Sequence, residues 1–233
     1  KKLLRMKLVS CAIASLMCHF SHAAVTPSIQ DYLNIAEQKQ LDQQTTWQRL
    51  MYADQNKQSE VVYQGYFYAK NGKTNLKEHA DVTALFAESA DNQSIRCKFP
   101  ARSHWLMRQL NIDTQRLPQV NCPEFDDWIN HIKPYKATLI YATDFMGNPS
   151  SMFGHTLLRL DPKDQKQLNL VSYAVNYAAT VNSADNWSYA WKGLTGQYPG
   201  EYSLMPYYRK VKEYGDFESR DLWEYELNLT PEE

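Results

Sequence analysis

The sequence predicts an α+β protein in which an α-rich N-terminal region, residues 24–133, precedes a β-rich region, residues 134–233. Two observations carry this prediction. Before Lys133, apolar residues recur at the three- and four-residue spacing of helices, whereas from Ala137 onward they form the short alternating or continuous runs of strands. The 233 residues are 43% hydrophobic and include 16 tyrosines and 6 tryptophans, which suits a strand-rich core and a groove for a glycan, peptide or lipid.

Residues 1–23 are typical of an export signal. A basic stretch at residues 1–7 is followed by the apolar run 8–20 and by a small-x-small cleavage site, Ser21-His22-Ala23. The apolar run is too short to span a membrane comfortably. We therefore expect a signal peptide that is cleaved before Ala24, and a periplasmic mature chain.

The cysteines predict one disulfide. Removal of the signal takes Cys11 and Cys18 with it and leaves Cys97 and Cys122, which should pair in an oxidising compartment. Closing this loop of 25 residues stabilises the fold by about 3 kcal/mol. The alternative is a reactive thiol at either position, but neither cysteine has a histidine at helical spacing.

Residues 24–133 are expected to form mainly helices, with one strand among them. The expected elements are a helix at 28–37 capped by Ser28, a helix at 46–51, a strand at 61–69, a helix at 76–88, and a helix after 97–102 that carries Trp105, Leu106 and Leu110. The histidines of this region look solvated or structural: His79, His104 and His131.

Residues 134–233 are expected to form a sheet. The apolar runs place strands at 137–142, 157–160, 168–177 and 222–229, with a turn at 161–164. Thr230 and Pro231, followed by two glutamates, are typical of a helix start. The sequence stops there and begins with a lysine, so we expect a fragment of a longer protein.

His155 is the strongest candidate for chemistry. It follows a turn at 148–151 and Gly154, and it opens a pattern that places His155, Leu157 and Arg159 on one face of a strand. An imidazole held by a strand at the edge of a loop suits a general base. The alternative is a histidine that only hydrogen-bonds the loop.

Two residues of the next strand are candidates to orient this imidazole. If Leu160 pairs with Leu168, His155 lies opposite Tyr173, and Asn176 is close by. A polar side chain beside a catalytic base is a common orienting device. The alternatives are a buried tyrosine and an asparagine at a strand end.

Other classes of site are weaker. The net charge of −1 argues against a nucleic-acid binder. A serine enzyme would need Ser151 and His155 on one helix, and a metal site with Asp144 lacks further ligands at suitable spacing. The loop 192–200 has glycines and an aromatic residue but no phosphate-loop motif, and it suits a groove wall or a lid.

Four motifs carry a resemblance to a known family. They are CKFPAR at 97–102, PSSMFGHTLLR at 149–159, KGLTGQYPG at 192–200 and RDLWEYEL at 220–227. With them the chain resembles the family of the Lnb N-terminal periplasmic domain, which is named for a lipoprotein N-acyltransferase. The resemblance implies an incomplete, permuted papain-like (NlpC-like) domain, in which the histidine precedes the nucleophilic cysteine.

The resemblance also implies a function and a set of site residues. It implies a cysteine-dependent acyltransferase or other lipid-acting enzyme with His155 as general base, no cofactor, and a membrane lipid or lipoprotein as substrate. We assign substrate contacts to the loops and strand of these motifs: Ser150, Ser151, Arg159, Lys192, Gly193 and Tyr198.

This sequence departs from the family pattern in one respect. No cysteine follows Cys122, so the nucleophile is expected beyond residue 233, and the fragment itself is expected to be inactive. Two other functions stay open. One is a non-catalytic binding module of the cell envelope, and the other is a cell-wall peptidase or amidase with the same cysteine–histidine pair.

Overall fold

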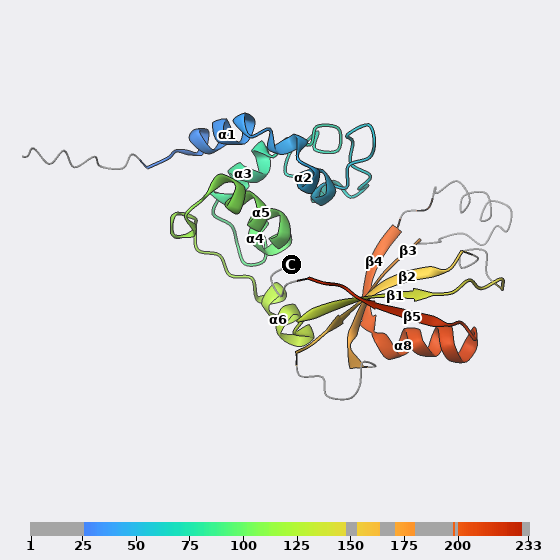
Figure 1. Cartoon of the computed structure of the whole chain (residues 1–233). Helices are drawn as coiled ribbons and strands as arrows, with labels where there is room; N and C mark the ends of the chain where they lie inside the picture. The colour runs from blue at the N-terminus through green and yellow to red at the C-terminus, as the bar shows by residue number, and fades with distance from the viewer. Residues whose placement is uncertain (1–25, 148–152, 164–170, 180–197, 199, 230–233) are drawn as a thin grey trace, which may run out of the picture.

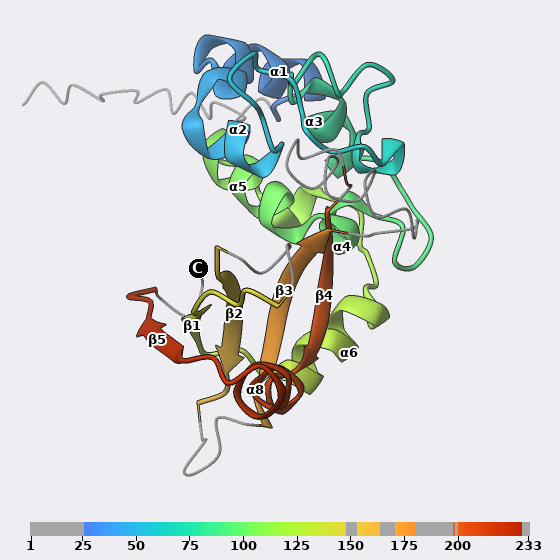
Figure 2. The ribbon, with the colours of Figure 1, turned by 90° about the vertical axis from the view of Figure 1, so that its right-hand side faces the viewer.

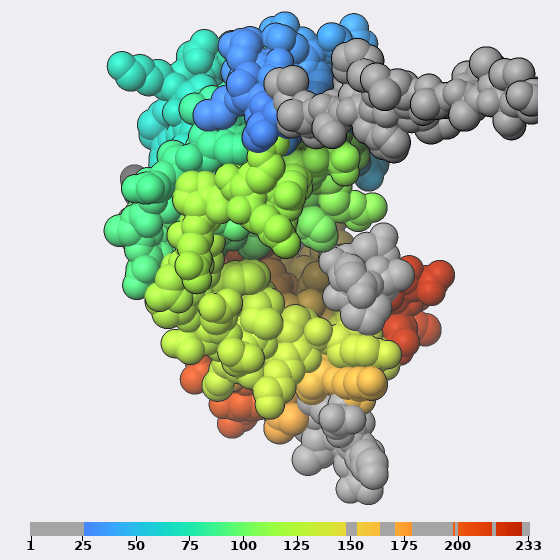
Figure 3. Space-filling model, turned by 90° about the vertical axis from the view of Figure 1, so that its left-hand side faces the viewer, coloured from blue at the N-terminus to red at the C-terminus, as the bar shows by residue number. Residues whose placement is uncertain are grey.

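A computed structural model describes residues 26–147, 153–163, 171–179, 198 and 200–229 of the chain (Figure 1). Its first half is a group of helices, and its second half is an antiparallel sheet with helix α8 beside it (Figures 1 and 2). This arrangement confirms the α+β class. Helix α6 lies between the helical group and the sheet, and the surface is hollowed between the helical group and the sheet side (Figure 3).

The helical half has short helices joined by turns. Its α-helices are α1 Ile29–Gln38, α2 Thr45–Leu50, α3 His79–Leu85, α4 Ile95–Lys98, α5 Pro100–Leu110 and α6 Pro123–Ile132. Its 3-10 turns are η1 Leu41–Gln43, η2 Gln64–Tyr66 and η3 Thr114–Arg116.

Local signals explain where several of these helices begin. The Ser28 hydroxyl accepts the Asp31 N–H at 3.3 Å, and the Asp31 carboxylate accepts the Ser28 N–H at 2.7 Å, which is a complete capping box. This confirms the predicted cap. Pro100 and Pro123 are the first residues of α5 and α6, a position where the missing N–H of proline removes no hydrogen bond.

Aromatic stacking and a disulfide hold the helical half together. Trp47 is fully buried, stacks on Trp105 with ring centroids 5.5 Å apart, and donates its Nε1–H to the Leu76 carbonyl at 2.6 Å. The predicted disulfide between Cys97 and Cys122 is confirmed, and it ties α4 to the start of α6.

Two predictions in this half are wrong. The expected strand at 61–69 is a loop around η2, because Tyr66 and Phe67 bond back to Tyr63 and Gln64 instead of to a partner strand. Alternating side chains form a strand only where another strand can pair with them. The helix expected at 76–88 is shorter and forms α3, His79–Leu85.

The strands of the described chain form one sheet in the order β4-β3-β2-β1-β5, and every neighbouring pair is antiparallel. The strands are β1 Lys136–Ala142, β2 His155–Asp161, β3 Tyr173–Ala179, β4 Gly200–Pro206 and β5 Leu222–Glu226. Between β4 and β5 lie α8 Tyr207–Val211 and the π-helix η6 Lys212–Phe217. The sequence patterns did not predict β4, α8 or η6.

The two faces of the sheet differ in burial. On one face, Ile140, Leu157 and Ala174 are buried against Tyr207 and Tyr214 of α8 and η6. The opposite face is also apolar, but it is half exposed, with exposed fractions of 53% to 59% for the aromatic side chains Tyr177, Tyr202, Trp223 and Tyr225. The helical half touches this second face at Tyr52, whose hydroxyl is 3.3 Å from that of Tyr202.

A buried charge cluster lies in the helical half. The Arg102 guanidinium has its Nε 3.2 Å from Asp81 Oδ1 and lies over the rings of Phe99 and Tyr66, at 3.9 and 4.6 Å. Glu78, one helical turn before Asp81, is equally buried. Two buried carboxyls therefore lie near each other, and the guanidinium of Arg102 is paired with one of them, Asp81. Burial raises the pKa of both, that of Asp81 to about 6, where Glu78 adds to the increase and Arg102 opposes it.

The Asp81 carboxyl should titrate near pH 6, well above its ordinary pKa of 3.8, in a carboxyl ¹³C NMR titration. Because the folded state holds this proton more tightly than the unfolded state, the stability that it contributes is complete below about pH 4 and is lost as the pH rises through 6. The free energy of unfolding, relative to that of an Asp81→Asn variant, should therefore fall between pH 4 and 6. The free energy of unfolding of the wild type relative to that of an Asp127→Asn variant, altered at an exposed acid, should show no such trend. An Asp81 midpoint near pH 4 would contradict the prediction.

Candidate functional site

His155 is the first residue of β2, as predicted. It pairs across the sheet with Ala142, the last residue of β1. Gly154, just before it, has a φ of +84°, a conformation that glycine adopts without strain. A Cβ atom at residue 154 would lie 2.6 Å from the Tyr141 hydroxyl and 2.9 Å from the Ala142 carbonyl oxygen. The glycine therefore allows the chain to enter β2 close to β1, with the imidazole at the end of this central strand.

Asn176 of β3 holds the imidazole. Its Oδ1 lies 2.5 Å from Nε2 of His155, and the asparagine is 4% exposed. Because an amide oxygen only accepts, this contact assigns the hydrogen to Nε2 and leaves Nδ1 as the acceptor nitrogen. The Asn176 amide nitrogen in turn donates to the hydroxyl of Ser203 on β4 at 3.4 Å, which sets which end of the amide faces His155.

Tyr173 does not lie beside His155, so that part of the prediction is wrong. The register pairs Leu160 with Tyr173 and Leu157 with Asn176, five residues away from the predicted pairing of Leu160 with Leu168. A shift by an odd number of residues moves Tyr173 to the other face of the sheet. The chain between β2 and β3 is longer than the turn that the sequence suggested.

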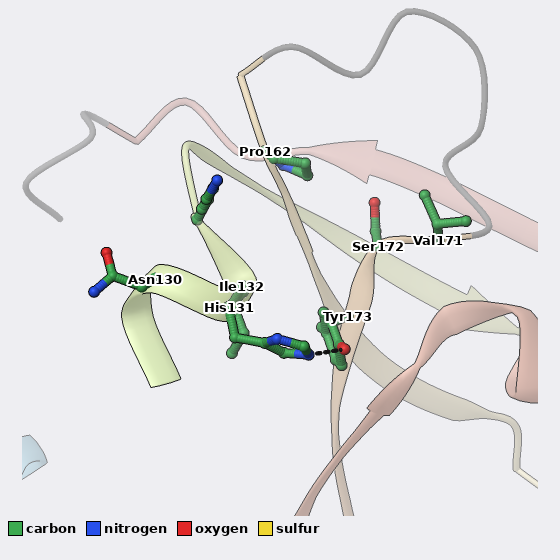
Figure 4. A pocket seen from close by; sticks show the side chains of 8 residues that line it. Asn130, His131, Ile132, Pro162, Val171, Ser172 and Tyr173 are labelled. Atoms are coloured by element: carbon green, nitrogen blue, oxygen red, sulfur yellow. Dashed lines mark hydrogen bonds between the residues drawn. The ribbon is translucent and has the colours of Figure 1, made fainter. Parts of the chain in front are cut away.

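Tyr173 instead contacts His131 of α6, with its hydroxyl 2.5 Å from Nε2 (Figure 4). The two side chains line a cavity of about 420 Å³ that also contacts Pro162, just after the end of β2. This cavity therefore lies at the opposite end of β2 from His155. His131, expected to be structural, connects α6 to the sheet.

Arg159 is buried and paired with two carboxylates. Its side chain is 3% exposed, and its Nε and Nη1 lie 2.9 and 2.6 Å from the carboxylates of Asp161 and Glu224. The Tyr207 hydroxyl donates to the same Glu224 oxygen at 3.1 Å, and burial raises the pKa of Tyr207 to about 12, with the Glu224 charge adding to the increase. This network joins β2, β5 and α8, and it favours a supporting role over the predicted substrate contact.

The remaining predicted substrate residues are not tested by the structure. Ser150, Ser151, Lys192 and Gly193 lie outside the described residues. Tyr198 is described and partly buried, but its neighbours on both sides are not, so its role stays a prediction.

Two residues that the sequence analysis did not assign to the site lie against it. The ring of Tyr214, in η6, packs edge-on against the imidazole with centroids 6.1 Å apart, and burial raises the pKa of its hydroxyl. Arg220 donates to the carbonyls of Thr143 and Ala142 at 2.6 and 3.2 Å. Arg220 is the first residue of one of the family motifs, so the sequence could have indicated that it belongs near the site. No sequence pattern indicated Tyr214.

The His155–Asn176 pair can accept a proton, but the described residues include no free thiol beside it. An imidazole whose Nε2–H is held by an amide has its other nitrogen available as a base. Both cysteines among the described residues are in the disulfide. Across the same residues, no three histidine, cysteine or carboxylate side chains are grouped to hold a metal ion.

Comparison with known proteins divides the chain into two matched segments. Residues 124–233 match the family model described as the Lnb N-terminal periplasmic domain, and residues 39–109 match one described as a domain of unknown function (DUF7843). No curated protein and no solved structure matches the chain. The first match includes all the described strands and the His155–Asn176 pair, and it supports the family that the motifs suggested.

The family description is that of a periplasmic domain, which supports a periplasmic or envelope location. Among the described residues, no helix combines the length and the apolar character needed to cross a membrane.

His155 should be a single tautomer with the hydrogen on Nε2, detectable as widely separated imidazole ¹⁵N chemical shifts above the pH at which the ring is protonated. An Asn176→Ala variant loses the acceptor, so its two nitrogens should move toward the averaged shifts of a tautomer mixture. His104, on the exposed side of α5, is the control and should be unaffected by the substitution. A wild-type His155 with averaged shifts would contradict the geometry.

Gly154→Ala should lower the free energy of unfolding by about 1–3 kcal/mol, because it combines a positive φ with contacts to Tyr141 and Ala142. Gly215→Ala is the matched control, since a Cβ there meets nothing within 4 Å. Denaturant unfolding measures both variants. Equal stability of the two would show that residue 154 tolerates a side chain.

Proposed function

We propose that this protein is an envelope enzyme of cysteine-dependent acyl transfer, related to lipoprotein N-acylation, in which His155 is the general base and Asn176 orients it. The proposal includes export by a signal peptide at residues 1–23. The observation that carries it is the hydrogen bond between His155 Nε2 and Asn176 Oδ1 across β2 and β3, at 2.5 Å.

The geometry suits this chemistry for a specific reason. A base must present an unprotonated nitrogen in a constant direction, and a hydrogen bond from the opposite nitrogen provides both conditions. Here the partner is an uncharged, buried amide. Hydrogen bonds connect three residues on neighbouring strands: His155 on β2, Asn176 on β3 and Ser203 on β4. The imidazole is partly buried, and Nδ1 makes no hydrogen bond within the described residues.

The proposed reaction has two halves. The thiol of a cysteine passes its proton to Nδ1 of His155, and the sulfur attacks the carbonyl carbon of an acyl ester. The ester C–O bond breaks, the alcohol leaves with the proton from the imidazole, and a thioester remains. An amine then attacks the thioester, its proton returns to the sulfur through the imidazole, and the C–S bond breaks to give an amide.

Cys97 and Cys122 are bonded to each other, and Cys11 and Cys18 lie in the proposed signal peptide, so the proposal requires a cysteine outside these 233 residues. The same fact favours the second candidate function, a non-catalytic envelope module that binds a lipid or a protein. The gene sequence distinguishes the two functions. The enzyme requires a cysteine codon after residue 233, at the start of a predicted helix.

In a protein that carries this cysteine, His155→Ala should reduce acyl transfer to the amine of a diacylated lipopeptide by 10²- to 10⁴-fold, the usual contribution of a general base. Mass spectrometry of the lipopeptide measures the product. His131→Ala is the control, because this histidine contacts Tyr173 on the other face of the sheet and should leave transfer unchanged. Undiminished transfer by His155→Ala would show that the histidine takes no part in the reaction. If the wild-type protein released peptides from cell-wall fragments and did not acylate the lipopeptide, a peptidase would be favoured.

A further inference from the structure

Arg220 is a buried cation at the end of the sheet that carries His155. It is 6% exposed, and its guanidinium donates from Nε to the Thr143 carbonyl at 2.6 Å and from Nη2 to the Ala142 carbonyl at 3.2 Å. Its Nη1 lies 2.9 Å from a carboxylate oxygen of Glu218. Every nitrogen of the side chain therefore has a partner. Two of the three partners lie at the end of β1: Ala142 is its last residue, and Thr143 follows it.

That end of β1 is the direct support of His155. Ala142 and His155 are paired residues of β1 and β2, so a displacement of the Ala142 backbone moves the Cα atom that carries the imidazole. The contact is reinforced next to Arg220, where Thr143 and Asp221 exchange hydrogen bonds: the Thr143 N–H donates to the Asp221 carbonyl at 3.0 Å, and the Asp221 N–H donates to the Thr143 hydroxyl at 3.1 Å.

The same arginine also holds the aromatic ring that packs on the imidazole. Its guanidinium lies 4.6 Å from the centre of the Tyr214 ring, and the backbone N–H of Arg220 donates to the Tyr214 carbonyl at 2.8 Å. Tyr214 is 4% exposed, and its ring meets His155 edge-on. Arg220 thus touches both structures that confine the imidazole, the neighbouring strand and the ring of Tyr214.

Stability alone is a poor reason for such a residue. Removing a guanidinium from water opposes folding, and apolar side chains of similar volume often replace buried ion pairs without loss of stability. What an apolar side chain cannot supply is a rigid fork that reaches two adjacent carbonyls while it stacks on a ring. The geometry of Arg220 therefore suits a role in orienting neighbouring groups better than a role in stabilising the fold.

We propose that Arg220 is a positioning residue, which fixes the orientation of the His155 imidazole through the end of β1 and through Tyr214. Its importance for catalysis rests on the proposed function, but its effect on the imidazole does not. Asn176 restrains the ring from the Nε2 side, and Arg220 restrains it through the backbone and through Tyr214. Together they limit the directions in which Nδ1 can point.

The experiment uses the imidazole ¹⁵N and ¹H shifts of His155 in the 233-residue chain. Arg220→Met keeps much of the side-chain volume but removes the fork, and Tyr214→Leu keeps an apolar group but removes the ring. Each variant should move the two His155 nitrogens toward averaged values and reduce the ring-current shift of the imidazole protons. Arg220→Lys, which keeps the charge but not the fork, should be intermediate.

The double variant and a control make the test specific. Because Arg220 acts through the end of β1 as well as through Tyr214, Arg220→Met should shift His155 further even in a Tyr214→Leu background. Arg209→Met alters an exposed arginine of α8 and should leave His155 unchanged. Circular dichroism and amide shift dispersion establish that each variant is folded.

A folded Arg220→Met variant with the wild-type His155 signature would overturn the proposal. Should that variant not fold, unchanged His155 shifts in Arg220→Lys and in Tyr214→Leu would overturn it equally. The proposed function fails separately: loss of the positioning signature together with undiminished acyl transfer by His155→Ala would leave Arg220 a positioning residue for an imidazole that is not catalytic.

Discussion

The antiparallel register of β2 between β1 and β3 is the constraint on which the site depends. Pairing with β1 sets His155 against Ala142, and pairing with β3 sets Leu157 against Asn176, so that imidazole and amide point to the same face. Side chains alternate along a strand, and a slip of one residue in either pairing would separate them. Gly154 makes this register possible, because a side chain there would meet β1.

Buried arginines mark the places where the elements are joined. Arg102 connects α3, α5 and the loop at Tyr66, Arg159 connects β2 with β5 and α8, and Arg220 connects the end of β1 with η6. Arg159 and Arg220 belong to motifs inside the segment that matches the Lnb N-terminal periplasmic domain, whereas the motif of Arg102 lies in the segment that matches the domain of unknown function. Their contacts show that residues of a motif can serve to hold elements of the fold together, since each of these arginines pairs with groups on other elements.

The errors of the sequence analysis have a common physical origin. The strand expected at 61–69 had the right alternation but no partner strand, and β4 was overlooked because Gly200–Pro206 has little regular alternation and depends on pairing with β3. Tyr173 was assigned to His155 because a short turn was assumed after Asp161. In each case the pattern described one segment, whereas strand formation and register belong to a pair of segments.

The sequence by itself determined the features that depend on neighbouring residues or on simple counting: the Ser28 cap, the disulfide between Cys97 and Cys122, and His155 at the start of a strand behind a glycine. The tertiary structure decided which side chains contact His155 and which support those contacts. Asn176 lies 21 residues away, and Tyr214 and Arg220 about 60. Contacts over such separations follow from strand order and turn length, and β5, the last described strand in the sequence, pairs with β1, the first.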